Sequence, residues 1–309
     1  MTTLLLHHPA AAAHATPAGH PERPDRIRAV ERALSAEAFG TLKRQLAPEA
    51  LMEEVALAHP IAWVEAIAKA NPKSGLVQVD SDTIMSPGTL EAILRGAGAA
   101  VAGVDAVMTG EAANAFGAMR PPGHHAERTR AMGFCFFNNA AIAARHAQRK
   151  HGAERVAIMD FDVHHGNGTQ DIFWDDASVL YASTHQMPLY PGTGAASERG
   201  DHDTIVNAPL RPGDGGEAFR EAMEAVILPR IEAFGPDLVV ISAGFDSHHR
   251  DPLGSLRFTE ADFAWATRAL MGVAERHAGG RVVSLLEGGY DLDGLAASAA
   301  AHVAALMEA

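Results

Sequence analysis

Short apolar runs rich in β-branched residues alternate along this chain with longer, alanine-rich stretches of helical character. The runs are apolar almost throughout, which is typical of strands covered on both faces. Alternation of such strands with helices predicts an α/β fold, in which a mostly parallel sheet lies between two layers of helices. The predicted strands are residues 76–79, 155–160, 179–183, 237–243 and 281–286, and the predicted helices are residues 89–108, 139–150, 217–234, 259–278 and 292–307.

The chain shows no repeat of fixed period and no low-complexity linker, so we expect residues 1–309 to form a single domain. A chain of this length can bury a large core. Lys and Arg total 25 and Asp and Glu total 38, which gives a formal net charge of −13. An acidic surface argues against a nucleic-acid partner and favours a basic substrate.

Cysteine usage and hydropathy bear on where the protein works. Cys135 is the only cysteine, so the chain cannot form an internal disulfide or a thiolate metal cluster. This usage is consistent with a reducing cytoplasm, which is the expected location. The apolar run at residues 4–6 is too short for a signal peptide or a membrane helix, and no other stretch is long enough to span a bilayer. We therefore expect no association with membranes.

Side chains of the kind that bind metals lie where two of the predicted strands end. Asp160, Asp162 and His164 occupy alternate positions, so an extended chain places them on one side, and Asp246 follows the strand 237–243. One such acid alone is better explained as the cap of a helix or loop. Together, buried acids of one sign need a counter-charge. Asp162, His164 and Asp246 would leave a fourth position open for water, as in catalytic zinc sites, and this oxygen-rich set would also accept iron(II).

A stiff turn over residues 120–126 carries two adjacent histidines, His124 and His125. Metal-assisted hydrolysis needs a base for the attacking water and an acid for the leaving amine, and histidine serves as either near neutral pH. Asp160 as a partner would favour an imidazolium, whereas the uncharged Asn167 would leave the other histidine with a lower pKa. A histidine pair taken alone is better explained as part of an ordinary surface turn.

Aromatic residues near glycines suggest how a substrate would be held. Tyr290 follows the strand 281–286 and two glycines, and its hydroxyl could stabilise a developing oxyanion. An ordinary turn with a packed tyrosine is the simpler explanation of that motif alone. Phe134, in an aromatic stretch at residues 133–139, and Tyr190 could form two walls of a narrow channel that grips an aliphatic stem.

Taken together, the motifs RPPGHHA, GFCFFNN, DFDVHHGNGTQ, SAGFDSH and LEGGYDL resemble those of the histone deacetylase family, in its class II-like bacterial branch. The resemblance extends from residue 20 to residue 290. It implies the three-layer arginase-deacetylase α/β fold with a central, mostly parallel eight-stranded sheet. It also implies zinc-dependent hydrolysis of N-acetyl-lysine or a related acyl-amine, with release of acetate and no covalent intermediate.

The resemblance assigns a role to each matching residue. The implied zinc ligands are Asp162, His164 and Asp246. His125 is implied to be the general base and acid, and His124 to be an electrostatic histidine with Asp160 as its partner. Asn167 stands where class I members have an aspartate, and Tyr290 is implied to be the tyrosine that binds the oxyanion. The implied substrate-binding residues are Gly133, Phe134, Tyr190 and Leu253, with Asp82 as an acid at the channel rim. Structural potassium is implied at Asp160, Asp162, His164, Ser183 and Thr184, and at a second site near Phe173, Asp176 and Val179.

Several functions remain open at this stage. Acetylpolyamine hydrolysis on the same fold is the main alternative, since an acidic protein attracts cations, although Leu253 at the implied gate is not the acidic gatekeeper typical of polyamine enzymes. The substrate would then be a small acetylated amine instead of an acetylated lysine side chain. A silent acyl-lysine-binding protein predicts a damaged set of residues, and a manganese ureohydrolase needs additional aspartate ligands. A homo-oligomer is also compatible with the sequence.

Overall fold

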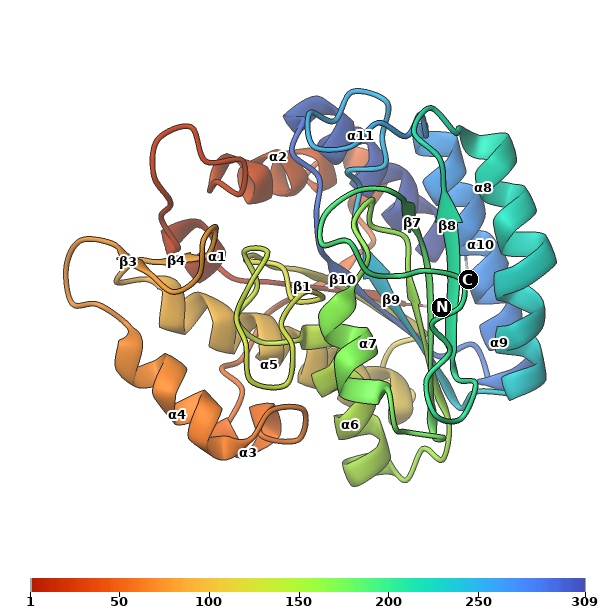
Figure 1. Cartoon of the computed structure of the whole chain (residues 1–309), viewed down its shortest axis with the longest axis horizontal. Helices are drawn as coiled ribbons and strands as arrows, with labels where there is room; N and C mark the ends of the chain where they lie inside the picture. Colours follow the sequence, from red (N-terminus) through yellow and green to blue (C-terminus); the bar gives the residue numbers. More distant parts are fainter. Residues whose placement is uncertain (1, 309) are drawn as a thin grey trace.

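A central sheet of eight parallel strands organises the computed structural model, which describes residues 2–308 (Figure 1). The strand order is β2-β1-β5-β10-β9-β6-β7-β8, and every pairing in the sheet is parallel. The predicted α/β fold with a central eight-stranded sheet is therefore confirmed. The strands are β1 Thr3–His7, β2 Lys43–Leu46, β5 Asn114–Ala118, β6 Val156–Asp160, β7 Val179–Gln186, β8 Ile205–Leu210, β9 Leu238–Ala243 and β10 Val282–Leu286.

Helices cover both faces of the sheet, because the central strands are apolar on both sides. The helices α5 (Thr89–Met108) and α6 (Asn139–His151) pack together on one face. The other face is covered by α2 (Asp25–Leu34), α10 (Glu260–His277) and α11 (Leu292–Leu306), which also pack on one another. Figure 1 shows the sheet between these two layers. Among the described residues, no helix is both long and apolar enough to cross a membrane.

Shorter elements complete the chain. The remaining helices are α1 Ala10–Ala13, a 3-10 turn at Glu37–Phe39, α3 Met52–Val55, α4 Ile61–Ala70, α7 Asn167–Phe173, α8 Gly216–Ala222 and α9 Leu228–Phe234. A π-helical turn, Met223–Ile227, separates α8 from α9, so the predicted helix 217–234 is interrupted at its middle. Such single π turns insert one extra residue into the helical ladder.

The predicted buried strand at residues 76–79 is wrong. Only Val77–Gln78 is extended, and this segment, β3, pairs antiparallel with β4 (Ile84–Met85) outside the main sheet. Leu76 is 49% exposed and Val77 39% exposed, so the apolar run covers no core. A short apolar run does not by itself specify a sheet position, because the position depends on neighbouring strands that the run does not encode.

The order of the strands determines which loops meet. Four neighbouring strands, β5, β10, β9 and β6, lie side by side in the middle of the sheet. Because they are parallel, their carboxyl ends emerge at one edge, where ligands bind in open α/β sheets. The ends of these strands and the loops that follow them carry all the histidines, acids and the tyrosine that the sequence singles out as catalytic or zinc-binding residues.

Candidate active site

Three buried side chains converge at the carboxyl edge of β6 and β9. His164 Nδ1 lies 3.1 Å from Asp162 Oδ1 and 3.1 Å from Asp246 Oδ2. One ligand atom from each of the three residues lies within 4.8 Å of the others. The two strands that lead to them are neighbours, with Asp160 opposite Ser242 in the register. Both aspartates are fully buried and His164 is 8% exposed.

Backbone amides orient the two carboxylates. Gly288 donates its N–H to Asp162 Oδ2 over 2.8 Å, and Val163 donates its N–H to Asp246 Oδ1 over 2.8 Å. Each carboxylate therefore has an oxygen held by a backbone N–H and an oxygen turned towards the His164 ring, and Asp162 Oδ1 also accepts the backbone N–H of His164 over 2.9 Å. Hydrogen bonds of this kind fix ligand orientation in metal sites. A Cβ atom at Gly244 or Gly288 would overlap these carboxylates, which is why the loops carry glycine there.

The residues fit a divalent cation. Burial and the neighbouring Asp162 raise the pKa of Asp246 to about 7, because two carboxylates so close repel each other. Burial disfavours protonation of His164, but its hydrogen bonds to Asp162 and Asp246 outweigh that effect and raise its pKa to about 10. Such a cluster calls for positive charge between its atoms. A set of one imidazole and two carboxylates suits zinc or iron(II).

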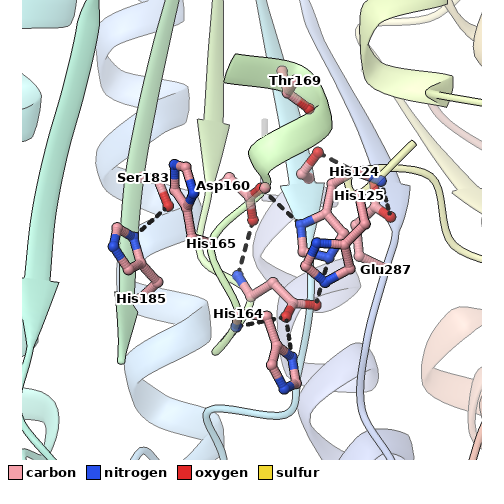
Figure 2. A network of polar contacts seen from close by, with 12 residues as sticks. His124, His125, Asp160, His164, His165, Thr169, Ser183, His185 and Glu287 are labelled. Atoms are coloured by element: carbon pink, nitrogen blue, oxygen red, sulfur yellow. Dashed lines mark hydrogen bonds and ion pairs between the residues drawn. The ribbon is translucent and has the colours of Figure 1, made fainter. Parts of the chain in front are cut away.

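The two adjacent histidines have different partners. Figure 2 shows the side chains of His124 and His125 together, close to Asp160. His124 Nδ1 lies 2.9 Å from Asp160 Oδ2, and its Nε2 lies 3.8 Å from Asp162 Oδ2. Burial opposes a charge on His124, but the attraction of Asp160 and Asp162 outweighs it and holds the pKa of His124 well above its usual range. This environment favours the charged, imidazolium form of His124.

His125 has the opposite environment. Burial, followed by repulsion from His124 and His164, holds the pKa of His125 well below its usual range. Its Nδ1 lies 2.8 Å from Asn167 Oδ1. The Asn167 amide orientation is fixed because Nδ2 donates to Glu127 Oε1 over 2.7 Å. His125 must then donate from Nδ1 to the Asn167 oxygen, which leaves Nε2 as the free basic nitrogen.

Tyr290 is positioned by a buried arginine that the sequence analysis did not single out. The Arg26 guanidinium lies 4.8 Å from the centroid of the Tyr290 ring and donates to the carbonyls of Glu287 and Gly289. Tyr290 itself is 9% exposed. Burial raises the pKa of Tyr290 well above its usual range, although Arg26 opposes this shift. The hydroxyl therefore keeps its proton and is available as a donor.

A buried glutamate, Glu287, was also missed. It accepts hydrogen bonds from the N–H groups of Gly123 and His124, at 2.6 and 3.1 Å, and from Ser242. Burial raises the pKa of Glu287 to about 7. The signal for Glu287 was present in the sequence, because it is an acid at the end of an apolar strand, as Asp160 is. It fixes the backbone of the turn that carries the histidine pair.

The two proposed channel residues lie against different residues of the site. The Tyr190 ring meets that of His125 edge to face, with centroids 5.2 Å apart, and the Phe134 ring meets that of Tyr290 in the same way at 6.0 Å. Tyr190 is 40% exposed, so it lies at the surface end of the site. Asp82 accepts a hydrogen bond from the Gly133 N–H over 3.0 Å, which ties the predicted rim acid to the predicted channel wall.

Leu253 stands apart from these contacts and lies half-buried in the loop after β9. Its N–H donates to Asp251 Oδ1, and Asp251 Oδ2 accepts the N–H of Tyr290 over 2.6 Å. Leu253 and Tyr290 are thus linked through one carboxylate. This link places the predicted gate residue on the same side of the sheet as the tyrosine.

Gly133 supports a test of how tightly His125 is held. Its φ is +56°, and a Cβ atom there would lie 2.7 Å from Cγ of His125. We expect Gly133→Ala to displace His125 and to lower kcat by at least about 10²-fold with unchanged metal content, because misplacement by 1 Å has that effect. Gly110→Ala is the matched control, since φ is +78° there and no atom lies within 4 Å. Equal activity losses in both variants would show that backbone strain, and not the His125 contact, is responsible.

The residues implied for potassium fall into two separate groups. Ser183 and Thr184 lie on β7, where Ser183 is opposite Asp160 in the register, so the first group is assembled beside the histidine turn. Ser183 and its neighbour His185 are visible there in Figure 2. Phe173, Asp176 and Val179 lie between the end of α7 and the start of β7, which is the opposite edge of the sheet. The two groups of residues therefore lie apart from each other.

Comparison with known proteins gives consistent results. A histone deacetylase domain model matches residues 20–306. The chain is 39% identical over 300 residues to a probable deacetylase of Archaeoglobus fulgidus, covering 95% of this chain and 83% of the relative. It is 41% identical over 278 residues to a histone deacetylase-like amidohydrolase of Pseudomonas aeruginosa, with 88% and 73% covered. The crystal structure of the HDA15 HD domain superposes with a TM-score of 0.92 at 38% identity, over 98% of this chain and 88% of that one.

Proposed function

We propose that this chain, which belongs to the histone deacetylase family, is a zinc-dependent deacetylase that hydrolyses the acetamide of an acetylated lysine side chain. One observation carries the proposal. Two adjacent buried histidines have pKa values moved in opposite directions, and they lie beside three converging metal-type ligands. Acid–base hydrolysis of an amide requires a neutral base and a charged group at one cation site, and His125 and His124 fit these two roles.

Each step of the reaction has a residue suited to it. A zinc ion held by Asp162, His164 and Asp246 would polarise the acetyl carbonyl and lower the pKa of a water molecule. His125 accepts the proton of the attacking water at Nε2, because Nδ1 donates to Asn167. The Tyr290 hydroxyl donates to the tetrahedral oxyanion, and the positive charge of His124 stabilises it. His125 then passes its proton to the amine nitrogen as the C–N bond breaks, which releases acetate and the free amine.

The substrate assignment rests on the walls of the site. The Tyr190 ring lies against His125 and the Phe134 ring lies against Tyr290, and an aliphatic stem fits between rings better than a charged chain does. The main alternative, an acetylpolyamine, is favoured by one observation. Asp82 and Asp80 lie close enough to Tyr190 to contribute to the upward shift of its pKa, after burial, while Arg130 opposes that shift. Arg130 pairs with Asp80 over 3.2 Å, so the negative charge of this rim lies mainly on Asp82. An acidic rim would attract a cationic polyamine.

Potassium binding is a second part of the proposal. Asp160, Asp162, His164, Ser183 and Thr184 would hold one ion, and the segment around Phe173, Asp176 and Val179 the other. For the first site, Thr184 Oγ1 is buried with no hydrogen-bond partner among the described residues, which supports a polar space next to Ser183. An ion there would stabilise Asp160, the partner of His124.

A turnover assay on two substrate classes tests the function. Zinc-loaded protein is expected to release acetate from an acetyl-lysine peptide faster than from acetylputrescine or acetylspermidine. The Tyr290→Phe variant is expected to lose about 10²–10³-fold in kcat with unchanged zinc content, because one oxyanion donor is removed. A preference for polyamines would transfer the assignment to that substrate class. No turnover of either class by zinc-loaded protein would contradict the proposal.

A further inference from the structure

A second cluster of metal-ligating side chains lies between α5 and α6, away from the site described above. Asp105 belongs to the last turn of α5, and His146 and His151 belong to the last two turns of α6. The Nε2 atoms of both histidines approach the same oxygen, Asp105 Oδ1, at 2.8 and 2.7 Å. We infer that Asp105, His146 and His151 form a second site for a divalent transition-metal ion, such as zinc.

The donor set determines the class of ion. Two imidazoles and one carboxylate suit Zn²⁺, Fe²⁺, Co²⁺ or Ni²⁺, whereas Mg²⁺ and Ca²⁺ prefer oxygen ligands throughout. Zinc binds imidazole nitrogen and carboxylate oxygen at about 2.0–2.1 Å, so ligand atoms in a tetrahedral shell lie about 3.3 Å apart. The two histidine nitrogens need to move from Asp105 by only about half an ångström to reach that spacing, which small side-chain rotations supply.

The local field also favours a cation. Helices α5 and α6 both end here, at Met108 and His151, and the carboxyl end of a helix carries partial negative charge. Arg149 and Lys150 lie in the same turn of α6 but are exposed, so solvent screens their charge. The negative charge of Asp105 offsets the remaining repulsion between these two side chains and a bound cation.

The three proposed ligands differ in how far they are buried. His146 is 5% exposed, which fixes its orientation, whereas the side chain of Asp105 is 46% exposed. An ion can therefore enter from solvent and complete its shell with water. The candidate site has a rigid buried ligand and an open entry path.

The position of the cluster indicates what the ion would do. Helix α5 leads into β5 and α6 leads into β6, so both carboxyl ends lie at the amino-terminal edge of the sheet, opposite the histidine turn. The loop that carries His124 and His125 connects β5 to α6. An ion bound here would join α5 to α6, which pack together in Figure 1, and would stabilise this unit without touching the substrate.

Counting metal equivalents tests the site. Chelator-stripped protein is loaded with Zn²⁺, gel-filtered, and analysed for zinc per chain. We expect His151→Gln and Asp105→Asn to hold one equivalent fewer than wild type, and His202→Gln, an exposed histidine outside the cluster, to match wild type. Equal zinc content in all four proteins would overturn the inference. Asp246→Asn removes the equivalent of the catalytic site separately, so the failure of that site is distinguishable from the failure of this one.

Thermal unfolding separates a metal site from a cluster held only by hydrogen bonds. Asp105→Asn keeps an oxygen that accepts from both histidines but lacks the charge that a metal requires. In the Asp246→Asn background, Zn²⁺ at about 100 times its Kd is expected to raise Tm by about 5 °C. Adding Asp105→Asn is expected to abolish that rise. A rise that persists in the double variant would contradict the inference.

Discussion

Replacing His125 by alanine is expected to lower kcat/KM for an acetyl-lysine peptide by about 10³-fold, within the usual range for loss of a general base. His125 is the only histidine of the pair whose pKa is held below its usual range, and its Nε2 is the free nitrogen. His124 cannot replace it, because its pKa is held well above the usual range and it stays protonated. Steady-state kinetics with zinc content and circular dichroism as controls measure the effect. A variant that retains a tenth of the activity would assign the base to another group.

The pH profile gives the same hypothesis a second test. A base must be neutral, so activity is present above the pKa of His125 and is lost as pH falls through it. That pKa is lowered, so the acid limb of kcat/KM is expected below pH 6.5. Asn167→Asp would add a negative charge beside Nδ1 and raise the pKa by about 1–3 units. The acid limb should then move to higher pH. An unmoved limb would mean that it reports another group.

The metal-type ligands and the histidine pair were predictable from the sequence because they lie at or just after the ends of buried strands. Buried parallel strands are recognisable as apolar runs, and polar residues at their ends meet because the strands end at one edge. Asp162 and Asp246 come together in this way, since β6 and β9 prove to be neighbours. No single apolar segment, however, specifies the order of the strands in the sheet. That β10 lies between β5 and β9 follows only from the whole set of pairings.

The main-sheet strands that the sequence analysis did not predict are β1, β2, β5 and β8. The apolar run at residues 4–6 gives β1 a clear local signal, whereas the other three strands have weak ones. At one edge of the sheet, β2 is exposed along its whole length. At the other edge, β8 contains Pro209, which edge strands tolerate and which argues against a strand when seen alone. The central strand β5 is short and contains Gly117 and two alanines, so it lacks β-branched residues. Tertiary packing determines all three.

The contacts that hold Tyr290 could not be predicted from the sequence for a different reason, because they join residues far apart in the chain. Arg26 donates to Gly289, 263 positions away, and Arg120 binds Glu22 across 98 positions. Nothing local distinguishes Glu22 from a surface glutamate. The structure shows instead that Glu22, Arg26 and Arg120 are fully buried together.

The largest effect on stability is expected from Glu22→Gln. The Glu22 carboxylate accepts from Arg120 Nε and Nη2 at 2.7 and 2.6 Å and from Arg26 Nη1 at 3.0 Å. Glutamine leaves two buried guanidinium groups without their counter-charge, and breaking a buried ion pair costs about 3–5 kcal/mol. Denaturant unfolding measures the free energy. Glu31→Gln is the control, since Glu31 is half-exposed on α2 and should change stability by about 0.5 kcal/mol or less.

The pH dependence of that loss follows from the pKa of Glu22. Burial raises it, but the attraction of Arg120 outweighs burial and holds the pKa well below its usual value of 4.5. A lowered folded-state pKa contributes stability that is present above the unfolded pKa and is lost as pH falls. The difference between wild type and Glu22→Gln should therefore be largest near neutral pH and shrink below about pH 4.5. Because Arg26 also holds Tyr290, kcat should fall in the same variant. A stable variant with lost activity would show that the cluster positions the tyrosine without supporting the fold.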